Sequence, residues 1–223
     1  MTAIELINAL RSLLQDENAP YKWADSAMIR YLNEAEEQTC RRAHLLIDAN
    51  TASICAFSVS ASVASYLLHS KIIQIRRLAV DSATIPLTQT YRDEMDRKDV
   101  AWMSLTGRPE AFIHEANNEL LLIGIPQSVD TARMVVARLP LANFSNGSGE
   151  TPEIDPKHHN GLLDWAMHRA YEKRDPDTQN IQASQFYETK FTVMFGPLPT
   201  AKAERLKRTL PRNMSARTRE FGT

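Results

Sequence analysis

The sequence is poor in cysteine and glycine and contains no long apolar run. Its 223 residues include two cysteines, Cys40 and Cys55, which we expect to be free, buried and structural in a reducing cytosol. Seven glycines are few for this length, which argues against glycine-rich nucleotide loops. No apolar stretch approaches the roughly 20 residues of a membrane span. Residues 1–14 lack a basic start and a small-residue cleavage site, so they do not resemble a signal peptide.

Motifs of catalysis and cofactor binding are also missing. The sequence contains no Walker loop and no GxGxxG, HExxH, GxSxG or CxxC pattern. Adjacent His158 and His159 cannot share a helix face, and His168 lies too far along the chain to join them easily. We therefore expect no enzyme activity, no cofactor and no metal site, and we interpret the histidines as ordinary surface or cap residues. The six histidines are His44, His69, His114, His158, His159 and His168.

Two groups of acidic residues have structural interpretations. Asp175 and Asp177 flank Pro176 without the central glycine and closing glutamate of an EF-hand loop, so we expect them to end one helix and begin the next. Glu34, Glu36 and Glu37 fall on the polar side of an amphipathic helix. This placement favours a solvated or subunit-facing surface over a role as general acid or base.

Charge is divided unevenly along the chain. Residues 1–196 contain 19 basic and 25 acidic residues, a net charge of −6, whereas residues 197–223 contain seven basic and two acidic residues, a net charge of +5. An acidic-leaning body with a basic, apolar-poor tail indicates a folded unit with an arm that docks onto a partner. The candidate partner-binding residues are Lys202, Arg205, Lys207, Arg208, Arg212, Arg217 and Arg219.

Helical periodicity is clear at both ends of the chain. We expect a helix over residues 2–14 and a second from Asp25 or Ser26, either of which can cap it. We expect two more helices, one over residues 162–171 and one that begins at Asp175-Pro176-Asp177 and continues to Gly196. Residues 200–210 form a further candidate helix. The apolar stripe of the first helix is Ile4, Leu6, Ile7, Leu10, Leu13 and Leu14, and that of the fourth is Ile181, Ala183, Phe186, Tyr187, Phe191, Met194 and Phe195.

The middle of the chain has the alternating pattern of β-strands. Asn117-Asn118 predicts a tight hairpin turn, and Thr106-Gly107-Arg108-Pro109 predicts another turn. The three tryptophans are spread along the chain, and we interpret them as packing anchors. The predicted strands are residues 53–59, 70–81, 85–87, 111–115, 119–123 and 132–138, with a short helix within residues 91–102.

This order of elements predicts an α+β fold. The two helical halves each have an apolar face that neither can bury alone, so we expect them to pack as one discontinuous helical bundle. The bundle comprises residues 1–50 and 151–210, and an antiparallel β-rich domain, residues 51–142, is inserted between them. Residues 143–150 have the composition of a flexible linker, and residues 211–223 form an extended basic C-terminal arm.

Short segments between residues 23 and 195 carry a family resemblance through their order and spacing. They are residues 23–36 followed by Cys40-Arg41-Arg42-Ala43, Tyr66-Leu67-Leu68 with residues 72–80, Trp102 with Thr106-Gly107-Arg108-Pro109, Ile125-Pro126, Leu139-Pro140, and Pro152-Glu153-Ile154 with His158 before the helix of residues 162–171. This pattern resembles the head-to-tail adaptor proteins of tailed bacteriophages, the group that includes the tail tubular A-type adaptors. The loop after Ala142 and the tail after Pro197 are not constrained by the resemblance.

The resemblance implies a non-enzymatic structural protein of the virion. Such adaptors form a closed ring, usually twelve-fold, between the portal protein and a downstream tail or nozzle protein, and they extend the channel for DNA ejection. A ring requires two different faces on each subunit. An acidic body can line a channel without gripping DNA, because like charges repel. The basic arm would then bind the portal, and we expect no contact with a membrane.

Two alternatives remain open. The chain can be a tail-completion or stopper protein lower in the same connector, which sequence does not distinguish from an adaptor. It can instead be a cytosolic nucleic-acid-binding protein that uses the basic arm to contact phosphates.

Overall fold

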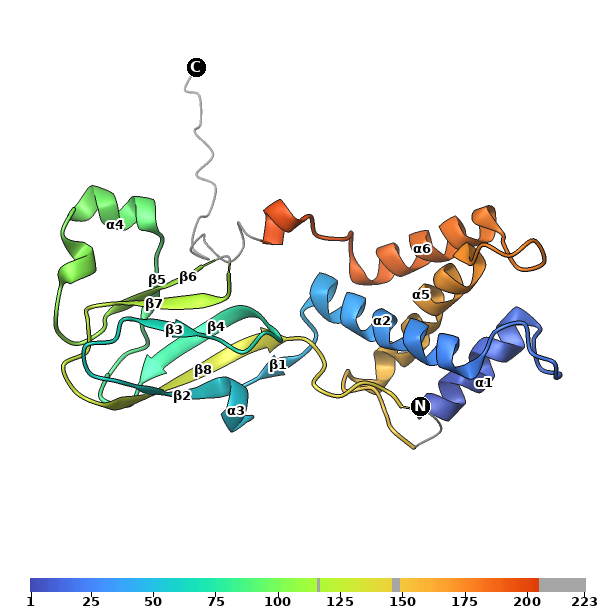
Figure 1. Cartoon of the computed structure of the whole chain (residues 1–223), viewed down its shortest axis with the longest axis horizontal. Helices are drawn as coiled ribbons and strands as arrows, with labels where there is room; N and C mark the ends of the chain where they lie inside the picture. The colour runs from blue at the N-terminus through green and yellow to red at the C-terminus, as the bar shows by residue number, and fades with distance from the viewer. Residues whose placement is uncertain (116, 146–148, 205–223) are drawn as a thin grey trace, which may run out of the picture. The chain divides into compact units, whose positions relative to one another are not determined.

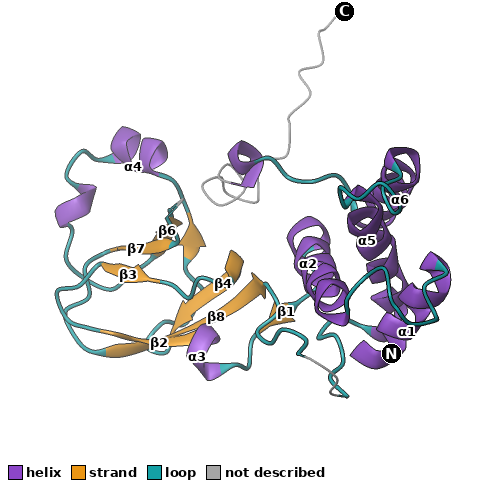
Figure 2. Ribbon diagram, turned by 45° about the vertical axis from the view of Figure 1, so that its right-hand side comes forward, coloured by secondary structure: helices purple, strands orange, loops and turns teal. Residues whose placement is uncertain are grey.

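The computed structural model describes residues 1–115, 117–145 and 149–204. Contacts within the chain divide it into two compact units, which we call the helical unit and the β unit. The helical unit combines Met1–Ile47 with Ala137–Pro199, and the β unit contains Asp48–Val136 and the described residues 200–204. Figures 1 and 2 show helices and sheets in the one chain, which confirms the predicted α+β class.

Four helices build the helical unit. They are α1 (Ala3–Leu14), α2 (Asp25–Ala43), α5 (His159–Glu172), which follows the short 3₁₀ helix η2 (Pro156–His158), and α6 (Ile181–Phe195). Helix α5 packs against α1, α2 and α6, whereas α1 and α6 make no comparable contact with each other. Gly161 lets α5 and α6 approach closely, because a Cβ there would lie 2.6 Å from the Phe195 ring. As a result, α1 and α6 provide two separate outer surfaces of one unit.

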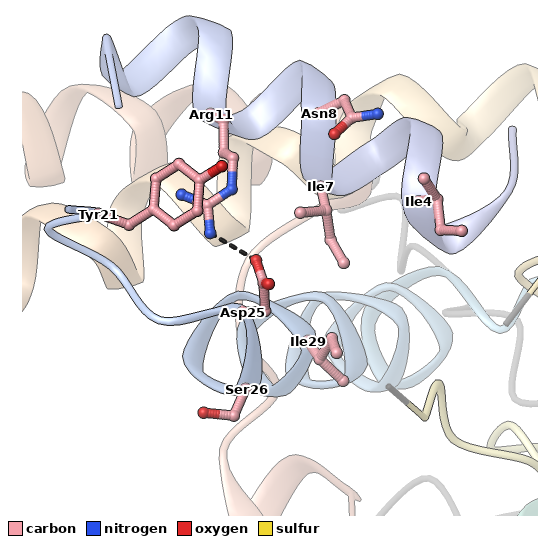
Figure 3. A pocket seen from close by; sticks show the side chains of 8 residues that line it. All are labelled: Ile4, Ile7, Asn8, Arg11, Tyr21, Asp25, Ser26 and Ile29. Carbon is pink, nitrogen blue, oxygen red and sulfur yellow. Dashed lines mark hydrogen bonds and ion pairs between the residues drawn. The ribbon is translucent and has the colours of Figure 1, made fainter. Parts of the chain in front are cut away.

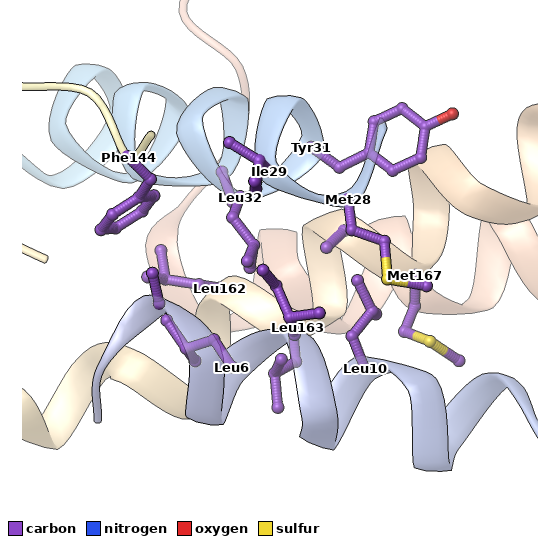
Figure 4. Packing of buried hydrophobic residues seen from close by; sticks show 14 of the residues in the cluster. Leu6, Leu10, Met28, Ile29, Tyr31, Leu32, Phe144, Leu162, Leu163 and Met167 are labelled. Atoms are coloured by element: carbon purple, nitrogen blue, oxygen red, sulfur yellow. The ribbon is translucent and has the colours of Figure 1, made fainter. Parts of the chain in front are cut away.

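The core of the helical unit joins residues that are far apart in sequence (Figure 4). Leu6 and Leu10 of α1, Leu32 of α2 and Leu162 of α5 are each 0% exposed. Burying a leucine side chain stabilises the folded state by about 1.5–3 kcal/mol relative to leaving it in water. Trp23 adds a directional contact, since its Nε1 donates to the Ala170 carbonyl at 3.2 Å.

The helix boundaries agree closely with the sequence patterns, but some faces and caps differ. Thr2 and Glu5 form a capping box at the start of α1, while Ile4 and Leu13 are 43% and 50% exposed and lie off the buried stripe. Neither Asp25 nor Ser26 caps α2, whose N-cap is Ala24 without a side-chain bond. Asp25 instead pairs with Arg11 of α1.

The second half of the helical unit corrects two further predictions. Asp177 does not begin the fourth helix, because α6 starts at Ile181 and is capped by the Asn180 side chain, which accepts from the Ala183 N–H. Helix α6 also does not bury all its apolar residues. Phe191 and Phe195 are buried, whereas Phe186 and Ile181 are each 61% exposed. The reason is that α6 lies at the outside of the unit, with α5 as its main neighbour.

Two sheets build the β unit. The first has the order β1 (Ile47–Asp48), β8 (Asp130–Arg138), β2 (Ala56–Val59), with β4 (Ile72–Val80) also paired to β8. The second has the order β3 (Ser65–Leu67), β7 (Glu119–Ile123), β6 (Ala111–His114), β5 (Thr88–Gln89). Ile75, Leu78, Leu120 and Val136 are among the fully buried residues of its core. Three short helices lie between strands of the unit: α3 (Ala52–Cys55), α4 (Arg92–Lys98) and the 3₁₀ helix η1 (Trp102–Ser104).

Most predicted strands are present, with three corrections. The hairpin is confirmed, since β6 and β7 pair antiparallel and Asn118 adopts φ 67° in the turn. Residues 53–59 begin as helix α3 rather than as a strand, and the strand predicted over residues 85–87 is instead β5. Strand β5 runs parallel to β6, so the sheets are not purely antiparallel. Ile85 lies outside β5 and is 76% exposed.

Candidate functional site

The predicted basic arm lies almost entirely beyond the described residues. Of its candidate partner-binding residues, Lys202 is described, and it is exposed in a short helical stretch, residues 201–204. The other six, Arg205, Lys207, Arg208, Arg212, Arg217 and Arg219, lie outside the described ranges, as do residues 205–210 of the candidate helix and the arm, residues 211–223. Their proposed role therefore stays a prediction.

The position of Glu36 differs from the solvated or subunit-facing surface that the sequence predicted for the acidic side of α2. Its side chain is buried, with 2% exposure, and its Oε1 accepts the backbone N–H groups of Glu153 at 2.6 Å and Ile154 at 3.3 Å. Burial raises the pKa of Glu36 to about 7, and the two backbone hydrogen bonds only partly oppose this rise. The carboxyl group faces this way because the segment before α5 crosses α2 and needs an acceptor for its N–H groups.

Glu153 also connects segments that are distant from each other in the sequence. Its carboxylate accepts from Ala142 N–H at 2.9 Å and Arg138 Nη1 at 2.6 Å, and also from Leu141 N–H. Burial acts to raise the pKa of Glu153, but these hydrogen bonds and the Arg138 charge hold it below its ordinary value. Burial also raises the pKa of the nearby Cys40 thiol to about 12, so this thiol is not a nucleophile at neutral pH.

The histidines do not assemble a reactive or metal-binding group. His114 and His159 are buried, at 0% and 2% exposure, which contradicts their interpretation as surface residues. His159 Nε2 bonds to the Ile154 carbonyl, and His168 Nδ1 lies 2.9 Å from the Ser184 hydroxyl, which also donates to the His168 carbonyl. Within the described ranges, no cluster of three His, Cys, Asp or Glu side chains has the arrangement of a metal site.

A groove with a volume of about 460 Å³ opens between α1 and the start of α2 (Figure 3). Ile4 and Ile7 of α1 and Ile29 of α2 form its apolar wall. At one end, the Arg11 guanidinium lies 3.6 Å from the centre of the Tyr21 ring and pairs with both Asp16 and Asp25. The groove lining therefore holds one cation, Arg11, and one carboxylate, Asp25, because Asp16 is buried at 4% exposure.

Helix α6 presents an exposed apolar ridge, which we define as Phe186 and Val193. These side chains are 61% and 83% exposed, and they lie on the side of the helix away from buried Phe191 and Phe195. The sequence carried a signal for this ridge, because apolar residues occur on both sides of α6. Composition alone did not indicate which side is covered.

Arg42 lies beside the C-terminal end of this ridge. Its guanidinium is 5.1 Å from the Trp165 ring centre and 4.9 Å from that of Phe191, and Nη1 donates to Thr192 Oγ1 and the Gly196 carbonyl. No carboxylate in the described part of the chain forms an ion pair with it, and its Nε has no hydrogen-bond partner there. Burial lowers the pKa of Arg42, while the charge of Glu188 opposes this at longer range. The result is a positive charge that lacks a paired anion.

The buried ionisable groups hold segments of the chain together, and the helical unit displays the ridge and the groove on separate surfaces. The family model described as SU10 adaptor protein matches residues 1–218, so the chain belongs to this family of phage head-to-tail adaptors. The resemblance read from the sequence is thereby confirmed. No curated protein matches the chain. None of the helices in the described ranges combines the length and apolarity needed to cross a bilayer.

Proposed function

We propose that this protein is a structural component of the virion that forms a closed ring at the head-to-tail junction. In this role the ring joins the portal protein to a downstream tail protein and extends the DNA channel. The adaptor family supports the role, and one structural observation carries the ring: the helical unit has two different apolar surfaces, on α1 with α2 and on α6. Two different faces are what a ring of identical subunits requires.

The ring subunit would be organised as the sequence predicts. We propose that residues 1–50 and 151–210 act as one discontinuous helical domain and that residues 51–142 act as an inserted β-rich domain. The burial of Leu6, Leu32 and Leu162 in one cluster supports the first part of this proposal. Residues 143–150 would then return the chain to the helical domain. Phe144, which is 6% exposed, anchors this return, and Asn33 holds its backbone through two hydrogen bonds.

Electron microscopy of the purified protein, alone and mixed with capsids that lack tails, tests the role. We expect rings of a single symmetry, twelve-fold by analogy with the resembling adaptors, bound at the portal vertex. Failure of the protein to occupy that vertex would contradict the adaptor role. A tail-completion protein would bind only to capsids that already carry an adaptor.

The basic arm has its own test. Deleting residues 210–223 removes Arg212, Arg217 and Arg219 with Glu220, a net charge of +2. The deletion should abolish attachment to tailless capsids while the thermal unfolding of the remaining chain is unchanged, because the basic arm is proposed to bind an acidic portal surface. Unchanged attachment would rule this role out.

The same charge favours the second candidate, nucleic-acid binding. DNA affinity that falls steeply as salt is raised would support that alternative, because each neutralised phosphate releases counterions.

A further inference from the structure

We propose that residues 150–155 form a proton-dependent latch on α2, which is closed when Glu36 is protonated and opens when Glu36 and Glu153 are both charged. We call these residues the latch. Its basis is the position of two carboxyl groups, those of Glu36 and Glu153, near the Arg138 guanidinium. The latch is a property of the folded chain itself and does not depend on the adaptor role.

Glu36 holds the backbone of the latch against α2. Its Oε1 accepts the N–H groups of Glu153 at 2.6 Å and Ile154 at 3.3 Å. The Ile154 side chain is 2% exposed and packs into the core of the helical unit. At the other end of the latch, the Glu150 carbonyl accepts the N–H of Ala3, the first residue of α1, at 2.7 Å. The closed latch therefore connects α2 with the start of α1.

The charges in this cluster balance when one of the two carboxyl groups is protonated. Arg138 is the cation whose charge acts on Glu36, but its Nη1 bonds to the Glu153 carboxylate at 2.6 Å. Ionised Glu36 therefore adds a second negative charge beside one positive charge, at a site where burial already disfavours charge. Glu36 is 2% exposed, whereas the Glu153 side chain is 24% exposed. The more deeply buried Glu36 is thus the group that takes up the proton.

Other ionisable groups lie around the latch. Burial raises the pKa of Cys40, one turn further along α2, to about 12. Glu37 pairs with Arg41 on the more exposed side of α2. At the exposed end of the latch, Asp155 pairs with Lys157, and hydrogen bonds from Lys157 hold the pKa of Asp155 below its ordinary value. Cys40 and Asp155 therefore keep one protonation state between pH 6 and pH 8.

His159 contacts the latch from the start of α5. Its Nε2 lies 3.0 Å from the Ile154 carbonyl, which can only accept, so Nε2 donates this hydrogen bond. Its Nδ1 lies 2.9 Å from the Met1 amine. Because a histidine can also respond to pH, a substitution at Glu36 is needed to separate the two groups.

Loss of the Glu36 proton favours an open latch, because water can hydrate the charge only when the latch moves away from α2. The two backbone N–H groups oppose opening, but burial outweighs them and raises the pKa of Glu36 from 4.5 to about 7. In the open state the exposed carboxyl group is already charged at pH 6, whereas in the closed state it becomes charged only near pH 7. The opening equilibrium should therefore increase about tenfold from pH 6 to pH 8.

Amide hydrogen exchange of the full wild-type chain, followed by NMR, tests the latch. The protection factors of the Glu153 and Ile154 amides should fall about tenfold from pH 6 to pH 8. At pH 8 their exchange should not respond to low concentrations of urea, because a local opening exposes little new surface. If the protection does not change with pH, or if urea accelerates this exchange as steeply as that of the buried α5 amides, the latch does not open by itself and the proposal is wrong.

Glu36→Gln assigns the response to Glu36. The variant keeps an oxygen that accepts both N–H groups and cannot ionise, so the protection of the Glu153 and Ile154 amides should be the same at pH 6 and pH 8. Glu37→Gln, the matched control on the same helix, should keep the tenfold fall. If Glu36→Gln also keeps the fall, another group such as His159 controls this segment, and the proposal is wrong. The wild-type measurement decides the matter even if the variant folds poorly.

Discussion

The helical unit and the β unit solve the same problem, the burial of backbone polar groups, in different ways. In the β unit, ladder hydrogen bonds between strands satisfy the backbone, and of its described charged residues only Asp48 is buried. The helical unit buries Arg11, Asp16, Glu36 and Arg42. Each of these contacts chain outside the regular helices or at a helix end. Where irregular segments cross a helical core, side chains must supply the acceptors and donors that a sheet supplies through its ladder.

The largest expected effect comes from Arg11. Its replacement in Arg11→Met leaves the buried carboxylate of Asp16 without its cation, and we expect unfolding to become easier by about 3–5 kcal/mol. Urea unfolding followed by circular dichroism measures this loss. A loss below about 1 kcal/mol would show that the helical unit does not depend on its buried ion pairs, and the contrast between the units would fail.

Core truncations separate the two units. Leu32→Ala and Leu78→Ala each remove a fully buried leucine, the first from the helical unit and the second from the β unit, and each should cost about 2–5 kcal/mol. Hydrogen exchange should show that Leu32→Ala weakens protection mainly in α1, α2 and α5, while Leu78→Ala weakens it mainly in β4 and β8. Equal loss of protection throughout the chain after either change would show that the units unfold as one.

Glu36 gives the helical unit a dependence on pH. Its pKa in the folded protein, about 7, lies above the ordinary value of 4.5, so the folded state binds the extra proton between these values. Stability contributed by this group is therefore complete below about pH 4.5 and is lost as the pH rises through about 7.

Glu36→Gln removes the loss of stability at high pH, because the neutral amide oxygen still accepts hydrogen bonds from the backbone N–H groups and carries no charge to bury. With about 1.4 kcal/mol for each tenfold change in proton affinity, the variant should be more stable than wild type by up to about 3 kcal/mol at pH 8. The two proteins should be nearly equal at pH 5. Denaturant unfolding at both pH values measures the difference, and Glu37→Gln, on the more exposed side of α2, is the matched control. The same difference at both pH values would contradict the assignment.

The smallest effect is expected in the β unit. Arg133 pairs with Asp81 through Nε at 2.8 Å, but both side chains are about half exposed or more. Arg133→Met should leave the midpoint of thermal unfolding almost unchanged, because exposed ion pairs contribute little to stability. Thermal unfolding of this variant and of Arg11→Met, measured side by side, compares the two ion pairs. If Arg133→Met lost as much stability as Arg11→Met, the distinction between the units would fail.

Local periodicity was sufficient for most of the secondary structure. The stripe of α1 and the Asn117-Asn118 turn predicted elements that the structure contains within a residue or two. The same reasoning failed where an element's neighbours decide the outcome. Glu36 lies among polar residues of α2, yet it is buried because residues 153–154 cross it. The apolar residues of α6 looked like one core face, yet Phe186 and Val193 are exposed because α5 covers only one side.

For the candidate assembly surfaces, too, part was determined by the sequence and part by the tertiary structure. Composition and charge by themselves determined that the chain has an acidic body, a basic C-terminal segment and none of the familiar catalytic motifs, because these are sums over residues that need no neighbours. Only the tertiary structure decided where the ridge and the groove lie. Both depend on which helix faces remain uncovered after residues from the two ends of the chain have packed together, and that choice is made by contacts between segments more than a hundred residues apart.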